Sequence, residues 1–114
     1  MAETPGENAK FHVDTHSLFQ EEVFTDLHMA TVRRLTPVKP DGSPDRSRKI
    51  VFVGQTSLMT PNGMIPLQTV IQAKELQQAF KRFPEAMQAA LAQLLEEAEK
   101  IEREETSRII VPGR

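Results

Sequence analysis

The sequence has 114 residues and contains no cysteine, no tryptophan and no tyrosine. Without cysteine the chain can form neither a disulfide nor a zinc site of the Cys type, and it lacks the usual thiol nucleophile. A chain of this length can nevertheless bury roughly two thirds of the surface that it exposes when unfolded. We therefore expect it to fold without a covalent or metal cross-link.

Long apolar stretches are also missing. The longest segment without a charged residue covers positions 50–73, and prolines at 61 and 66 interrupt it. A membrane-spanning helix needs about 20 consecutive, predominantly apolar residues. The N-terminus is acidic and polar, unlike the N-terminus of a signal peptide. We therefore expect a soluble, cytoplasmic protein without a membrane partner.

The motifs of common enzyme classes are absent as well. The sequence has no Gly-x4-Gly-Lys-Ser/Thr loop, no Gly-x-Gly-x-x-Gly loop, and no serine in a Gly-x-Ser-x-Gly elbow. Aspartates could meet in space, but a carboxylate pair for acid–base catalysis also needs a pocket that shifts one pKa. We therefore expect no catalytic residues and no cofactor, and the sequence favours a non-enzymatic protein.

Charges of the two signs are separated along the chain, although the net charge is only −2. Positions 30–50 have a local balance of +4, and positions 84–105 have a local balance of −5 because seven glutamates outnumber Lys100 and Arg103. Such an asymmetry favours complementary self-association or the steering of a charged partner. The alternative is a pair of solvated faces without a partner.

The first part of the chain predicts strands. Residues 1–10 are polar and should be disordered, and residues 11–20 fit either a short strand or a capped helical turn. Residues 22–36 alternate between apolar and polar side chains, which predicts one strand with a β-bulge near 31–33. The proline-rich segment 37–48 predicts a long loop.

Two further strands follow this loop. Residues 49–59 contain the apolar run Ile50–Val53, which is typical of a strand at the centre of a sheet. The segment Thr60-Pro61-Asn62-Gly63 predicts a hairpin turn, because asparagine and glycine tolerate positive φ. Residues 64–72 form the third strand. Because proline has no N–H, Pro66 predicts either that this strand lies at an edge of the sheet or that Pro66 faces outward.

The second half of the chain predicts a long amphipathic helix. Apolar residues recur at the helical spacing of 3.6 residues and form one stripe. Pro84 lies inside this pattern, which predicts either one kinked helix or a helix over 74–82 followed by one over 84–105. The stripe consists of Leu76, Phe80, Phe83, Met87, Ala90, Leu91, Leu94, Leu95, Ala98 and Ile101.

Together these elements predict an α+β fold, in which a three-stranded antiparallel sheet packs against the long C-terminal helix. The predicted domain spans residues 11–106. Residues 107–114 form an apolar tail, and Ile109–Val111 could return as a fourth strand or add to the sheet edge of a neighbour. The tail could equally be frayed.

The leading functional hypothesis is a protein-interaction or regulatory module that acts as a homo-oligomer. One helix covers only one face of the sheet, and the stripe has the 4-3-4-3 spacing of a coiled-coil seam. A homodimer is the simplest way to cover the remaining apolar surface, and a two-fold axis could set basic against acidic segments. The candidate interface residues are Met87, Leu91, Leu94, Ala98, Ile101, Ile109, Ile110 and Val111.

Two alternatives depend on other residues. Phosphate contact requires only cations within reach, so the basic segment 33–49 is the candidate for nucleic-acid binding; its cations are Arg33, Arg34, Lys39, Arg46, Arg48 and Lys49. The net charge of −2 argues against a general polyanion binder, and exposed aromatics for base stacking are missing, so this hypothesis is kept as the alternative rather than the leading one. A metal-dependent enzyme or sensor would use imidazole and carboxylate ligands; the candidates are His12, Asp14, His16 and His28.

Overall fold

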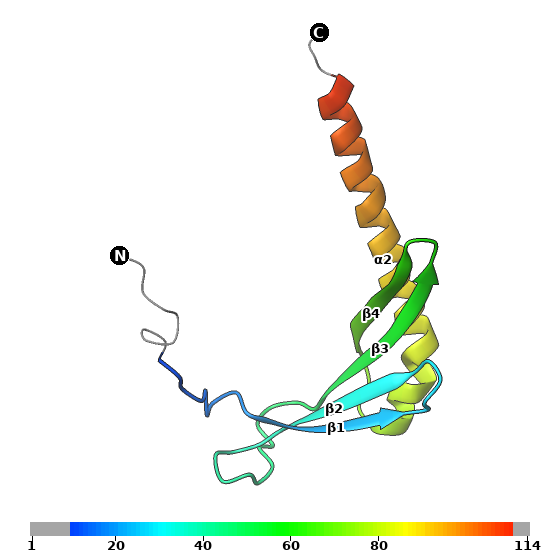
Figure 1. Ribbon diagram of the computed structural model, residues 1–114. Helices are drawn as coiled ribbons and strands as arrows, with labels where there is room; N and C mark the ends of the chain where they lie inside the picture. The colour runs from blue at the N-terminus through cyan, green and yellow to red at the C-terminus, as the bar shows by residue number, and fades with distance from the viewer. Residues whose placement is uncertain (1–9, 111–114) are drawn as a thin grey trace.

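The computed structural model of the protein describes residues 10–110, so the tail predicted to be disordered lies outside the described residues apart from Lys10. Four antiparallel strands form one open sheet in the order β1-β2-β3-β4. A single long helix, α2, follows the sheet and packs on one of its faces (Figure 1), which confirms the predicted α+β fold. The elements are β1 (Phe19–Thr25), β2 (Thr31–Pro37), β3 (Val51–Thr60), β4 (Gly63–Ile71) and α2 (Leu76–Ile110).

The prediction of one strand over 22–36 is wrong, because a turn divides this segment into β1 and β2. The Asp26 carboxylate accepts backbone N–H bonds from His28, Met29 and Ala30 at 2.8, 3.0 and 3.1 Å. Leu27 has a positive φ of 61°, which a strand does not allow. The side chain of Asp26 therefore reverses the chain where the apolar alternation alone suggests that it continues.

The fourth strand thus comes from the N-terminal part of the chain. Residues 10–18 contain neither a strand nor a helix, and β1 begins at Phe19. Ile109 and Ile110, predicted as part of an added strand, continue α2 instead. Val111 lies outside the described residues.

The positions of β3 and β4 agree with the sequence. β3 pairs with both β2 and β4 and therefore lies inside the sheet, whereas β4, which contains Pro66, is an edge strand. In the turn between them only Gly63 has a positive φ, of 116°. Asn62 keeps a negative φ, so the glycine alone supplies the conformation that closes this hairpin.

The core lies between α2 and the β3–β4 half of the sheet. Phe52, Leu67 and Ile71 from the strands are buried against Ala79, Phe83 and Met87 from the helix. Gly54 lies directly beneath the helix: a Cβ atom there would be 2.8 Å from both Ile71 Cδ1 and Met87 Cε. The absence of a side chain at position 54 therefore allows the helix to approach β3 closely.

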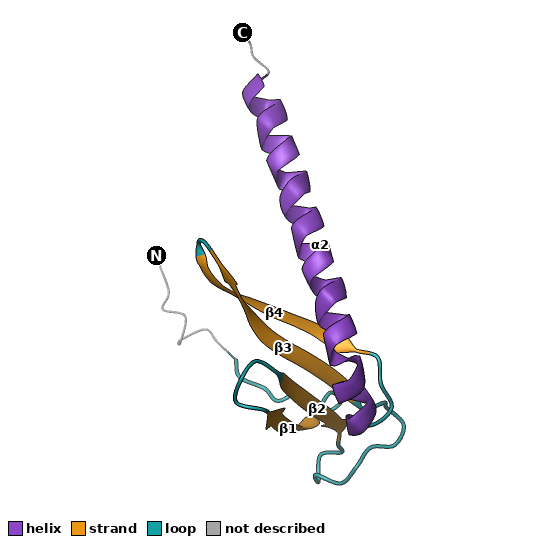
Figure 2. Cartoon of the chain, turned by 90° about the vertical axis from the view of Figure 1, so that its right-hand side faces the viewer, coloured by secondary structure: helices purple, strands orange, loops and turns teal. Residues whose placement is uncertain are grey.

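α2 is one continuous helix of 35 residues with Pro84 in its interior, so the alternative of two separate helices is wrong. At 1.5 Å per residue it is about 52 Å long, and it extends well beyond the end of the sheet (Figure 2). Within residues 10–110, no helix combines the length and apolar character needed to cross a membrane.

The contact at Gly54 yields a stability prediction. Gly54→Val should lower the free energy of unfolding by about 1–3 kcal/mol, because the new methyl groups would displace Ile71 and Met87. Valine is the better strand former, so propensity alone predicts the opposite sign. Urea unfolding monitored by circular dichroism measures the change. Ser57→Val, on the other face of the same strand, is the control, and equal stability of the two variants would contradict the close approach.

Candidate interaction surfaces

The distal part of α2 presents apolar side chains to solvent. The helix contacts the sheet through residues up to Leu94, which packs at the margin of the core. Beyond that point Leu95 is 56% exposed and Ile101 is 55% exposed, and Ala98 between them is also exposed. The described part of the chain therefore leaves the end of the helical stripe uncovered.

A groove lies between β1 and the proximal part of α2. Its volume is about 710 Å³. The rings of Phe24 on β1 and Phe80 on α2 meet edge to face across it, with centroids 6.3 Å apart. Its remaining walls are mainly apolar, and they comprise Val23, Thr25, Asp26, Ala30, Val32, Phe83 and Pro84.

The groove exists because α2 covers only half of the sheet. The helix backbone lies over β3 and β4 and reaches β2, but among the described residues it does not approach β1. Strands are about 4.8 Å apart, so four of them form a layer roughly 19 Å wide, whereas a helix with its side chains is about 10 Å across. The β1 side of this face therefore has room for a second helix.

The other face of the sheet has no covering layer among the described residues. Val23, Met59, Met64 and Val70 lie on this face and are more than half exposed. Residues 11–18 do not cover it, since Phe11 and Val13 are themselves exposed. It is a mixed surface, because Gln55 and Gln68 are also on it and hydrogen-bond across the strands at 2.8 Å.

The structure divides the predicted interface residues into three groups. Met87 is buried in the core, and Leu91 and Leu94 are half-buried at its margin. Ala98 and Ile101 are exposed and free to contact another molecule. Ile109 and Ile110 lie at the helix end, and Val111 is outside the described residues.

Half of the basic residues proposed for nucleic-acid binding are engaged within the chain. Arg33 pairs with Glu21 at 3.0 Å and Arg34 with Glu22 at 2.7 Å across the β1–β2 pair. Arg48 pairs with Asp45 at 3.1 Å. The remaining three cations are exposed: Lys39, Arg46 and Lys49. The structure therefore does not assemble the six into one free basic surface.

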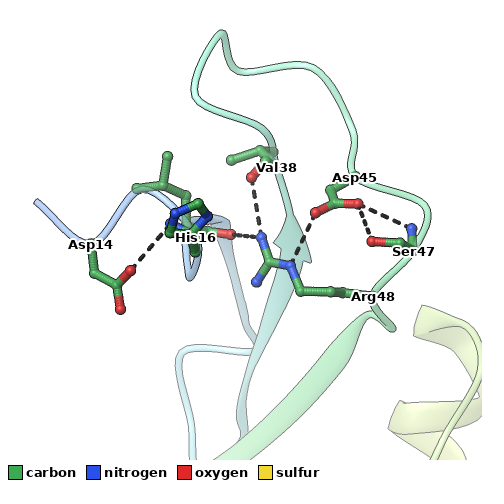
Figure 3. Close-up of polar contacts among 7 residues, drawn as sticks. Asp14, His16, Val38, Asp45, Ser47 and Arg48 are labelled. Atoms are coloured by element: carbon green, nitrogen blue, oxygen red, sulfur yellow. Dashed lines mark hydrogen bonds and ion pairs between the residues drawn. The ribbon is translucent and has the colours of Figure 1, made fainter.

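Arg48 has a structural position in the loop between β2 and β3. Its guanidinium donates to the carbonyl oxygens of Leu18 and Val38, at 2.9 and 3.1 Å, while its Nε donates to Asp45 (Figure 3). The guanidinium also lies 5.0 Å from the centroid of the Phe19 ring, within cation–π range. One side chain thus joins the loop to the segment that enters β1.

The predicted metal ligands remain apart in the structure. Asp14 accepts a hydrogen bond from the backbone N–H of His16 at 3.2 Å, and His28 lies in the β1–β2 turn, where its N–H donates to Asp26. All four candidates are exposed. Among the described residues, no three histidine, aspartate or glutamate side chains cluster in a way that could hold a metal ion.

Comparison of the chain with known protein families, with curated proteins and with solved structures finds no match.

The groove between β1 and α2 has no counterpart among the predicted site residues. The sequence pattern places Phe80 and Pro84 only in the helix, and it places Phe24 in a single strand over 22–36 without the turn at Asp26. The alternation over β1 gives no indication of which strand the helix covers. Phe80 belongs to the predicted apolar stripe, yet it is 46% exposed in the structure. The sequence therefore identifies this aromatic residue but not the groove that it lines.

The loop that holds Arg48 yields a prediction on pH. The Ser47 hydroxyl and backbone N–H, together with Arg48, lower the pKa of Asp45 from its ordinary value of 3.8 to about 2. A depressed carboxyl pKa in the folded state stabilises the fold above the unfolded value and loses this effect as the pH falls through the folded value. The contribution of Asp45 should therefore be complete above about pH 4 and disappear towards pH 2.

Carboxyl-detected NMR titration of the folded protein measures the pKa of Asp45 directly. Ser47→Ala should raise it towards 3.8, because the hydroxyl donor at 2.6 Å is lost. Ser43→Ala, which removes the corresponding donor to Asp41, is the control and should leave Asp45 unchanged. A native Asp45 that titrates near 3.8 would show that this loop is not ordered as described.

Proposed function

We propose that the protein is a non-enzymatic interaction module that acts as a homo-oligomer, and that the distal part of α2 is its contact element. The observation that carries this proposal is the continuation of the apolar stripe beyond the end of the sheet, through Leu95, Ala98 and Ile101. Isolated helices gain little stability in water from propensity alone, and most helices in proteins depend on packing of an apolar face. A packing partner for this segment is therefore favoured.

The polar groups of the chain support the same proposal. Asp26, Asp41 and Asp45 each accept hydrogen bonds from nearby residues in turns, so their carboxylates already have local structural roles. The ion pairs of the described residues join neighbouring strands or residues of one loop. The groove beside β1 and the distal stripe of α2 are mainly apolar, which suits association with another protein chain.

A matched pair of substitutions on α2 tests this proposal. Ala98 and Ala89 are both exposed, and they are nine residues apart, or about two and a half turns, so they lie on opposite sides of the helix. Ala98→Glu should weaken self-association by roughly tenfold or more, because it places an unpaired charge in the apolar contact. Ala89→Glu adds the same charge on the outer side and should have little effect.

Sedimentation equilibrium over a wide concentration range measures both variants and the parent chain. Circular dichroism verifies that the fold is retained, as expected at two exposed positions. A parent chain that stays monomeric at millimolar concentration would refute the homo-oligomer. A dimer weakened equally by both substitutions would refute the assignment of the contact to this stripe.

A further inference from the structure

The charges on α2 are distributed unevenly along its length. The segment that leads into the helix and its first two turns contain Lys74, Lys81 and Arg82 against Glu75. Positions 96–105 contain six glutamates against Lys100 and Arg103. The proximal part of the helix is therefore basic, and the distal part, which extends beyond the sheet, is acidic.

An apolar strip connects these two parts on the side of the helix that faces the groove. At 100° per residue, Phe80, Pro84, Leu91, Leu95 and Ala98 all fall within a sector of about 60°. Phe80 and Pro84 line the groove beside β1, and Leu95 and Ala98 are exposed beyond the sheet. The strip is thus continuous from the groove to the distal helix.

Lys81 and Glu99 lie along one edge of this strip. They are 18 residues apart, or five full turns, so they project from the helix in the same direction. In an antiparallel pair of helices related by a two-fold axis, each edge faces the same edge of the other helix. In such a dimer, Glu99 of each protomer would lie beside the partner subunit's Lys81. This gives two such contacts, one at each end of the helix pair.

From this geometry we infer that the protein forms a two-fold dimer in which the α2 helices pair antiparallel, with the crossing near residue 90. This inference rests on the proposed homo-oligomer and specifies its arrangement. Leu95 and Ala98 of one protomer lie beside the partner subunit's Phe80 and the partner subunit's Pro84, in the groove over β1. Glu99 of each protomer pairs with the partner subunit's Lys81.

Charge decides between this arrangement and a parallel one. Parallel helices in register would place the two distal segments, each with six glutamates, side by side, and like charges at close range disfavour association. The antiparallel arrangement brings each acidic segment to a basic one.

The sheet supports the same arrangement. Packed helices lie 8–10 Å apart, and α2 does not extend over β1, although Val32 of β2 is already buried in the core. The distal helix of the partner, lying beside the proximal part of α2, would occupy the space over β1 and cover Phe24 and Phe80. Each sheet would then be covered by two helices, one from each protomer, which matches its width of roughly 19 Å.

A charge exchange on the full-length chain tests the pairing. Glu99→Lys should raise the dimer dissociation constant roughly tenfold at low salt, because two ion pairs become two repulsions, and Lys81→Glu should do the same. The double variant, Lys81→Glu with Glu99→Lys, should restore dimerisation. Glu96→Lys is the control. This substitution changes the net charge by the same amount and removes the i,i+4 pair with Lys100, but the side chain at position 96 projects away from the strip.

A second measurement reports the direction of the helices independently of charge. Since the chain has no cysteine, single spin labels can be attached through Gln93→Cys and Lys100→Cys, both on the outer side of α2. In the antiparallel dimer the axial separation between the two labels is roughly 9 Å at position 93 and roughly 30 Å at position 100. In a parallel dimer the two positions would give similar distances.

The outcomes separate this inference from the proposed function. The antiparallel dimer is supported if the double variant dimerises again and the distance between the two spin labels is longer at position 100 than at position 93. A dimer that responds equally to Glu99→Lys and Glu96→Lys, or that gives equal label distances, overturns the arrangement and leaves self-association standing. A parent chain that remains monomeric overturns both.

Discussion

The close approach of α2 to β3 at Gly54 determines the arrangement of the rest of the molecule. With no side chain at that position, Phe83 and Met87 pack directly on the strand, and the helix is held over β3 and β4. Two consequences follow from this placement. The helix does not extend over β1 on the same face. It begins beside the end of β4 and runs past the β3–β4 turn into solvent (Figures 1 and 2).

The sequence predicts those elements whose signals are local and periodic. The helical stripe, the central position of the Ile50–Val53 run and the edge position of the strand with Pro66 all follow from spacing or from the chemistry of one residue. The division of residues 22–36 into two strands does not. Apolar alternation continues on both sides of the turn. The interaction that divides the segment is the set of three hydrogen bonds that the Asp26 carboxylate accepts from backbone N–H groups.

The candidate surface is predictable only in part for a related reason. Periodicity identifies the stripe on α2 but cannot tell which of its residues the sheet covers, since that depends on where along its length the helix leaves the sheet. Met87 therefore lies in the core and Ile101 in solvent, although the pattern treats them alike. The groove beside β1 is even harder to predict from the sequence, because Phe24 and Phe80 come into contact only through the tertiary fold.

The ion pairs of the sheet and the loop explain why the charge of the distal helix matters. Glu21, Glu22 and Asp45 neutralise Arg33, Arg34 and Arg48 within the chain, so much of the basic segment is already compensated locally. The glutamates of positions 96–105 have only Lys100 and Arg103 nearby on the same helix. Their excess charge flanks an apolar strip, and an apolar strip with one sign of charge favours a partner that combines apolar contact with the opposite sign. The proximal part of α2, with its groove and its lysine and arginine side chains, has both properties, and this match is the physical basis of the proposed antiparallel pairing of two copies of the chain.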